Sequence, residues 1–269
     1  MSAVRVLILR AAGINCDLET EFAWRKVGAE TARVHIRQLI EAPKLLNEYQ
    51  ALTIPGGFSY GDDISAGRIL AAQLERCLDE TIRDFVARGS LVLGICNGFQ
   101  VLVKAGLLPC GIGENGQRGC TITYNDPPGF KDRWVHLRAN VPQCAFLEHG
   151  KRYELPIAHG EGRVRFSDEL GLKRALAANR AALLYVAAEG DSREPSHATD
   201  AEFSLVNPNG SDGDIAGMCD QTGRILGLMP HPERFVSGTQ HPCWTSRAYR
   251  EDGDGLAIFR RAYDHVRRG

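Results

Sequence analysis

Short apolar runs alternate with amphipathic stretches along the first half of the chain. The apolar runs cover residues 4–9, 31–36, 51–54 and 90–95, and each predicts a buried strand. Helical spacing of apolar residues follows these runs at 17–27, 68–88 and 98–105. Each predicted helix ends at a glycine, as helix C-termini often do. This alternation predicts a parallel sheet with helices on both faces.

The second half of the chain is less regular. We expect strands at 134–139, 162–166, 182–188, 215–220 and 224–228, and helices at 170–179 and 255–266. The last two strands are predicted to form a hairpin around 220–223. The polar segment 191–202 is expected to be a surface insertion, and 241–254 a loop. Because no repeat, low-complexity tract or linker interrupts the pattern, we predict a single domain over 1–269.

Composition narrows the class of protein. The chain has 269 residues, and 32 basic against 33 acidic side chains give a net charge of −1. This balance gives no electrostatic reason to expect nucleic acid or an anionic membrane as a partner. The apolar run at 91–103 is too short and too polar to span a bilayer. The N-terminus lacks a signal-peptide pattern, so we expect a cytoplasmic protein. The cysteines show no zinc-site spacing, so no metal site is expected.

Residues 94–98, Gly-Ile-Cys-Asn-Gly, lie where a predicted strand meets a predicted helix. This is the spacing of a nucleophile elbow, in which the flanking glycines keep Cβ atoms out of a crowded corner. The central residue is strained, and its side chain points out at the carboxyl edge of the sheet. There it faces a helix N-terminus, which favours a thiolate. The alternative is a buried cysteine in a Gly-rich turn. The strand before and the helix after favour Cys96 as a nucleophile.

A thiol nucleophile needs a base and a group that orients the base. His231 lies just past the strand predicted at 224–228, between two prolines that stiffen the loop. Glu233 is two residues further on, close enough to reach the second ring nitrogen. Taken alone, this segment could be a surface His-Pro turn. Together with Cys96, it predicts a base and its orienting carboxylate.

The reaction also needs hydrogen-bond donors for a developing oxyanion. The elbow offers the backbone N–H of Asn97. A second donor should come from a loop at the same edge of the sheet, and residues 55–58, Pro-Gly-Gly-Phe, directly follow a predicted strand. We assign the Gly57 N–H to this oxyanion hole, with Phe58 as the neighbouring possibility. The alternative is an ordinary Pro-Gly turn.

These motifs, in this order, resemble the class I glutamine amidotransferases, the Cys-His-Glu family. Longer strings narrow the resemblance to the glutaminase subunits of phosphoribosylformylglycinamidine synthase, which works in de novo purine synthesis. The strings lie at 13–17, 55–62, 94–100, 157–163, 207–211 and 229–234. The resemblance therefore spans nearly the whole chain.

The resemblance implies a fold and a set of roles. The fold is a flavodoxin-like α/β domain. Cys96 would attack the side-chain amide of glutamine to form a γ-glutamyl thioester. His231 would protonate the departing ammonia and then activate water, and Glu233 would orient His231. The implied substrate contacts are Gly56, Phe58, Gln100, His159 and Gly160.

The resemblance also implies a partner. The sequence contains no P-loop or dinucleotide-binding fingerprint, so no cofactor is expected in this chain. ATP and magnesium would be held by a synthase subunit, which receives the ammonia and converts formylglycinamide ribonucleotide to formylglycinamidine ribonucleotide. Some bacterial systems add a small third subunit.

Three other functions compete with this interpretation. An amidotransferase feeding guanylate or cytidine nucleotide synthesis would lack the strings at 58–62 and 159–163. A cysteine hydrolase or deglycase of related fold would not be expected to carry His-Pro-Glu. A catalytically silent binding subunit would be suggested by the loss of Cys96, His231 or Glu233, and all three are present.

Some residues have no assigned chemistry. His149, His197 and His241 lie in loop-like sequence and are expected at the surface. Cys16 falls within one of the family strings, but we expect a packed turn cysteine there. The stretches 189–202 and 235–249 match no motif.

Overall fold

The computed structural model describes residues 3–62, 65–108, 119–188 and 206–268. Its central sheet contains a parallel half in the order β2-β1-β3-β4-β11. This is the strand order of flavodoxin-like folds. The strands are β1 (Arg5–Arg10), β2 (Glu30–His35), β3 (Ala51–Ile54), β4 (Leu91–Ile95) and β11 (Ile225–Leu228). The predicted α/β class is confirmed.

The sheet continues beyond β11 as an antiparallel half, in the order β10-β9-β6-β7. These strands are β10 (Ile215–Cys219), β9 (Ala181–Val186), β6 (Lys131–Ala139) and β7 (Arg152–His159). Strands β10 and β11 form the predicted hairpin. A separate two-stranded sheet pairs β5 (Cys120–Thr123) with β8 (Arg163–Phe166).

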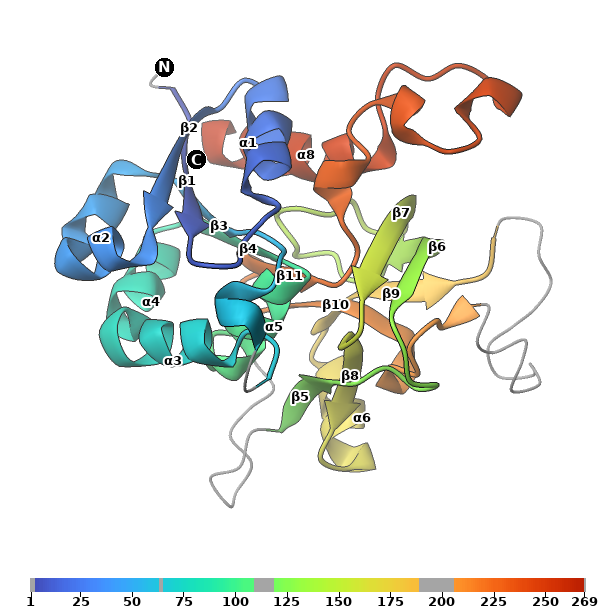
Figure 1. Ribbon diagram of the computed structural model, residues 1–269, viewed down its shortest axis with the longest axis horizontal. Helices are drawn as coiled ribbons and strands as arrows, with labels where there is room; N and C mark the ends of the chain where they lie inside the picture. Colours follow the sequence, from blue (N-terminus) through green and yellow to red (C-terminus); the bar gives the residue numbers. More distant parts are fainter. Residues whose placement is uncertain (1–2, 63–64, 109–118, 189–205, 269) are drawn as a thin grey trace.

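Helices cover both faces of the parallel half (Figure 1). On one face lie α1 (Asp17–Lys26) and α8 (Asp254–Arg268), joined by an edge-on contact between Trp24 and Phe259. On the other lie α3 (Arg68–Cys77), α4 (Asp79–Ala87) and α5 (Asn97–Lys104). Helices α2 (Ile36–Glu41) and α6 (Glu169–Ala177) follow β2 and β8. That residues 1–269 form one domain stays a prediction.

The sequence-based expectation missed the short elements α2 and β5, and it also differs from the structure at two longer elements. The single helix expected at 68–88 is two helices, broken at Leu78, whose φ of −134° lies outside the helical range. No glycine or proline marks this break, so the periodicity alone could not locate it. The sequence pattern does not predict strand β7 either, because Pro156 lies inside it. The strand tolerates this proline because β7 is the edge strand of the sheet.

His241 is not the surface residue that the sequence suggested. It is buried, its Nε2 lies 3.2 Å from Glu154 Oε1, and its ring packs on Trp134 at 4.3 Å between centroids. Arg247 also binds Glu154, at 2.5 Å. The stretch 235–249 is therefore held against β7 by the contacts of His241 and Arg247 with Glu154. His149 is exposed as expected, whereas His197 and the insertion expected at 191–202 lie outside the described residues.

No helix within the described ranges is long and apolar enough to cross a bilayer.

Candidate active site

Three sequence motifs meet at one edge of the sheet. The loop at 55–58 follows β3, the turn at 94–98 follows β4, and the segment 229–234 follows β11. These three strands are neighbours and run parallel, so their carboxyl ends lie side by side. In open α/β sheets this edge is where ligands bind.

Cys96 occupies the strained turn that the glycine spacing predicts. Its φ of 51° and ψ of −105° are uncommon for a residue with a side chain. The flanking glycines are sterically required: a Cβ on Gly98 would lie 1.9 Å from the Ile54 carbonyl oxygen, and one on Gly94 would lie 2.7 Å from the Gly98 carbonyl oxygen. Cys96 heads α5 and lines a cavity of about 230 Å³. The thiol therefore faces solvent-accessible space at a helix N-terminus.

His231 and Glu233 form a buried pair beside this cavity. Nδ1 of His231 lies 2.6 Å from Oε1 of Glu233, and the two side chains are 2% and 0% exposed. Burial alone would lower the pKa of His231, but the Glu233 carboxylate and the side chains of Cys96 and Cys16 raise it well above its ordinary value. The backbone N–H of His231 donates to the Pro156 carbonyl at 2.8 Å, which fixes the loop after β11 against β7.

The remaining polar atoms of this pair are uncommitted. Within the described residues, His231 Nε2 and Glu233 Oε2 are buried and make no hydrogen bond. Because Nδ1 is held by Glu233, the ring presents Nε2 to a reacting group. The pair has the arrangement expected of a base and its orienting carboxylate.

The loop at 55–58 leaves one candidate for the second oxyanion donor. The Phe58 N–H donates to the Gly13 carbonyl at 2.9 Å, so it is already used. Gly57 has a φ of 141°, and a Cβ there would lie 2.7 Å from the Asn15 nitrogen. Gly56 has a packing role, because a Cβ there would lie 2.9 Å from Cε1 of His231. The structure thus favours Gly57 over Phe58.

The Asn97 side chain joins the nucleophile turn to the adjoining loop. Its Oδ1 accepts from the Ser59 N–H at 3.2 Å, and its Nδ2 donates to Asp62 Oδ1 at 3.2 Å and to Gln100 Oε1 at 3.0 Å. Gln100 in turn donates to the Glu161 carbonyl. Gln100 lines the cavity, but both ends of its amide are engaged. Its direct role is to join the two walls of the cavity.

His159 and Gly160 also line this cavity, as does the half-exposed Phe58. Asn125 Oδ1 accepts from the Gly162 N–H at 2.9 Å and lies 3.1 Å from His159 Nδ1. Nδ1 therefore carries the proton, and Nε2 is an acceptor. Burial, followed by the nearby His231, lowers the pKa of His159 to about 3. His159 thus stays neutral in the physiological range.

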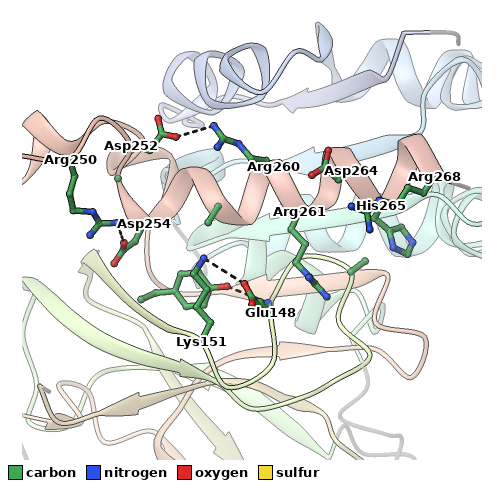
Figure 2. Close-up of a pocket in the computed structure, with 14 residues that line it drawn as sticks. Glu148, Lys151, Arg250, Asp252, Asp254, Arg260, Arg261, Asp264, His265 and Arg268 are labelled. Atoms are coloured by element: carbon green, nitrogen blue, oxygen red, sulfur yellow. Dashed lines mark hydrogen bonds and ion pairs between the residues drawn. The ribbon is translucent and has the colours of Figure 1, made fainter.

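A larger cavity, of about 640 Å³, lies between α8 and the loop before β7 (Figure 2). Charged side chains dominate its lining. Many of them pair with one another, as in Arg250 with Asp254, Arg260 with Asp252, and Lys151 with Glu148. No nucleophile–base pair lines it within the described residues. Chemistry therefore favours the smaller cavity at Cys96.

Cys16 lies close to the His231–Glu233 pair, which the sequence did not indicate. One ligand atom from each of these three side chains lies within 4.8 Å of the others, and such a set of sulfur, nitrogen and oxygen could hold a metal ion. An ion taking Nδ1 would break the 2.6 Å bond to Glu233. Cys16 does not line the cavity, and burial raises the pKa of its thiol. Cys96 is therefore the better candidate for the nucleophile.

Similarity to known proteins identifies the family of this chain. The CobB/CobQ-like glutamine amidotransferase domain matches residues 3–266. The chain is 44% identical over 268 residues to the phosphoribosylformylglycinamidine synthase subunit PurQ of Dehalococcoides mccartyi, covering 99% of each chain. The chain belongs to the PurQ family of glutamine amidotransferases.

Solved structures share the fold of this chain. A chain in the structure of PurLQS from Thermotoga maritima aligns with a TM-score of 0.71 and 28% identity, covering 98% of this chain and 100% of that one. A glutamine amidotransferase from Thermotoga maritima aligns with a TM-score of 0.52 and 16% identity, over 91% of this chain and 82% of that one. At that identity the second likeness shows the shared fold alone. PurQ membership confirms an enzyme of the glutamine amidotransferase class.

Proposed function

We propose that this chain hydrolyses the side-chain amide of glutamine at Cys96, and that a synthase subunit uses the ammonia to convert formylglycinamide ribonucleotide to formylglycinamidine ribonucleotide. The observation that carries the proposal is the meeting of Cys96, the His231–Glu233 pair and Gly57 at the ends of three adjacent parallel strands. PurQ membership supports the same reaction.

The first step forms a thioester. The Cys96 thiolate attacks the amide carbon, and the negative charge moves to the amide oxygen. The backbone N–H groups of Gly57 and Asn97 would stabilise that oxygen. As the tetrahedral intermediate collapses, Nε2 of His231 gives its proton to the leaving nitrogen, and ammonia departs. Glu233 holds the charged ring through Nδ1 at 2.6 Å.

The second step releases glutamate. His231 is now neutral, and Nε2 takes a proton from water as the oxygen attacks the thioester carbon. The same two backbone donors stabilise the second oxyanion. The thiolate leaves, and the enzyme returns to its starting state. One ring nitrogen therefore acts first as an acid and then as a base.

The cavity walls fit glutamine. His159 offers an Nε2 acceptor that has no partner among the described residues, which suits the α-ammonium group of an amino acid. Gly160 leaves space along the same wall, because the nearest atom to a Cβ there is 3.9 Å away. Gln100 and Gly56 act by holding the walls and the His231 ring, and Phe58 covers the mouth.

The ammonia needs a protected route to its acceptor, because in neutral water it becomes mostly ammonium. The PurLQS structure contains the Thermotoga relative. We infer that this chain likewise docks on a PurL synthase subunit, which would hold ATP and magnesium, with a small PurS subunit. Three exposed aromatic side chains at the mouth of the cavity, Phe58, Tyr124 and Phe130, offer a surface for that contact.

A glutamine-analogue electrophile tests the nucleophile directly. After reaction with a diazoketone analogue, peptide mass spectrometry should find one added group, on Cys96, and Cys96→Ser should abolish both labelling and glutaminase turnover. Cys16→Ser should still be labelled at Cys96. Labelling at Cys16, or more than about a tenth of wild-type turnover in Cys96→Ser, would overturn the assignment. A silent binding subunit would show neither labelling nor turnover in the assembled complex.

A further inference from the structure

Cys16 packs against the catalytic pair but takes no part in the proposed chemistry. The residue is 1% exposed and precedes the first residue of α1. Its sulfur approaches the His231 ring across Gly56. A Cβ on Gly56 would lie 3.2 Å from Cys16 Sγ and 2.9 Å from His231 Cε1, so only glycine leaves room for both.

Besides its interaction with the His231 side chain, this thiol makes two further hydrogen bonds. Arg234 Nη2 donates to Cys16 Sγ at 3.1 Å, and the S–H donates to Asn15 Oδ1 at 3.3 Å. A neutral thiol can donate and accept at once, and burial, which raises its pKa, keeps this one neutral. The backbone is fixed as well, because the Cys16 N–H donates to the Gly56 carbonyl at 3.2 Å. The sulfur is thus held in one place by neighbours on three segments.

Arg234 brings a positive charge next to Glu233, its neighbour in sequence. Besides Cys16, the guanidinium lies 3.7 Å from Glu19 at the surface. Glu233 Oε2 is buried without a hydrogen bond in the described structure. A guanidinium released from the thiol would find an acceptor at that oxygen. It would then compete with His231 for the carboxylate and offset the charge that stabilises the protonated ring.

We propose that Cys16 is a positioning residue. Its thiol binds the Arg234 guanidinium and keeps it from pairing with the Glu233 carboxylate, so that the carboxylate pairs with His231. The inference rests on the proposed role of His231 as the proton donor to ammonia. It explains why a buried cysteine lies beside the dyad without lining the substrate cavity.

The test is a set of variants assayed in the assembled synthase for glutaminase kcat, KM and pH profile. Cys16→Ala should lower kcat about tenfold, leave KM within about twofold of wild type, and move the alkaline limb to lower pH, because the imidazolium loses its proton more easily. Cys16→Ser keeps an acceptor for Arg234 and a donor for Asn15, so it should restore the alkaline limb. Cys219→Ala, a buried cysteine on β10, is the matched control and should behave as wild type.

The second arm removes the guanidinium. In an Arg234→Met background, adding Cys16→Ala should produce no further shift of the alkaline limb. The inference is wrong if Cys16→Ala has a wild-type limb, if Cys16→Ser shifts as far as Cys16→Ala, or if the shift persists in the Arg234→Met background. If Cys16→Ala fails to fold, the pH profiles of Cys16→Ser and Arg234→Met still test the inference. Arg234→Met alone must not move the alkaline limb to lower pH. Glutaminase activity in Cys96→Ser would instead contradict the proposed function itself.

Discussion

The Asn97 side chain holds Asp62 at 3.2 Å, and through this bond and the one to Ser59 it ties the nucleophile turn to the loop after β3. That loop carries Gly57, the proposed second donor of the oxyanion hole. In the proposed site, Asn97 would contribute its backbone N–H to the hole, and its side chain would set the position of the other donor. Asn97 is only 1% exposed, so water does not substitute for these bonds.

Replacing this amide should therefore slow the chemical step more than it weakens binding. We expect Asn97→Asp to place two carboxylates face to face and to lower kcat about 10²-fold, the loss typical of one oxyanion donor. The double variant Asn97→Asp/Asp62→Asn exchanges donor and acceptor and should recover part of the loss. Steady-state glutaminase assays with thermal melts check this, and equal losses in the single and double variants would contradict the coupling.

The His231–Glu233 pair predicts an unequal pair of losses. His231→Ala removes the group that moves the proton, so kcat should fall about 10²–10⁴-fold. Glu233→Gln keeps a hydrogen-bond partner, so its loss should be smaller. Because the carboxylate raises the pKa of His231, its removal should move the alkaline limb of kcat/KM to lower pH.

A second His–Glu pair provides the control for this prediction. Glu154 and His241 lie 3.2 Å apart, away from the cavity. Glu154→Gln should leave the alkaline limb in place, even where loosening of the 235–249 stretch lowers the thermal stability of the variant. Comparable kcat losses in His231→Ala and Glu233→Gln would contradict the division of roles. The exception is a pH profile showing that the Gln side chain introduced at position 233 holds the His231 ring in the wrong tautomer.

The active-site strand ends were predictable because each motif is local. The glycine spacing at 94–98 and the proline spacing at 229–234 each predict the local backbone geometry from a few neighbouring residues. Cys16 was not predictable in this way. Its contact with Arg234 joins residues 218 positions apart. Only the folded arrangement of β1, β3 and β11 brings them together.

Other expectations failed for reasons of burial. The sequence around His241 is polar, yet the ring is enclosed between Trp134 and Glu154. A loop-like pattern does not reveal that the loop folds back on β7. Likewise, Asn125 carries no motif, although its amide fixes the tautomer of His159. Such supporting residues depend on tertiary contacts that periodicity does not encode.

His159 predicts a pH dependence of stability. Its folded pKa is about 3, below the ordinary value of 6.5. Above pH 6.5 the ring is neutral in both states and makes no difference. As the pH falls below 6.5, the unfolded chain gains a proton that the folded chain refuses, so stability is lost at up to about 1.4 kcal/mol per pH unit. His159→Gln should therefore lose stability less steeply between pH 6.5 and 4.

Urea unfolding of both proteins at several pH values measures this difference. Other titrating groups, including His231, contribute to both curves and cancel in the comparison. Parallel curves across the acid range would show that His159 takes up its proton in the folded state, and the neutral-acceptor role proposed for its Nε2 would fail with it.

The last prediction concerns docking. A glutaminase that hydrolyses glutamine without an acceptor for the ammonia wastes its substrate. Turnover of the isolated chain should therefore be low. It should rise when the synthase subunit, ATP and formylglycinamide ribonucleotide are added. The loop bearing Gly57 is the element best placed to respond. It carries the exposed Phe58 at the cavity mouth, and Tyr60 and Asp62 within it have positive φ values of 56° and 54°. Such a strained loop can shift between two arrangements on contact with a partner. The measurement is glutamate release with each component added in turn, using Cys96→Ser to confirm that docking itself survives loss of the nucleophile. Full turnover from the isolated chain, unchanged by the additions, would remove the coupling and favour a free-standing glutaminase.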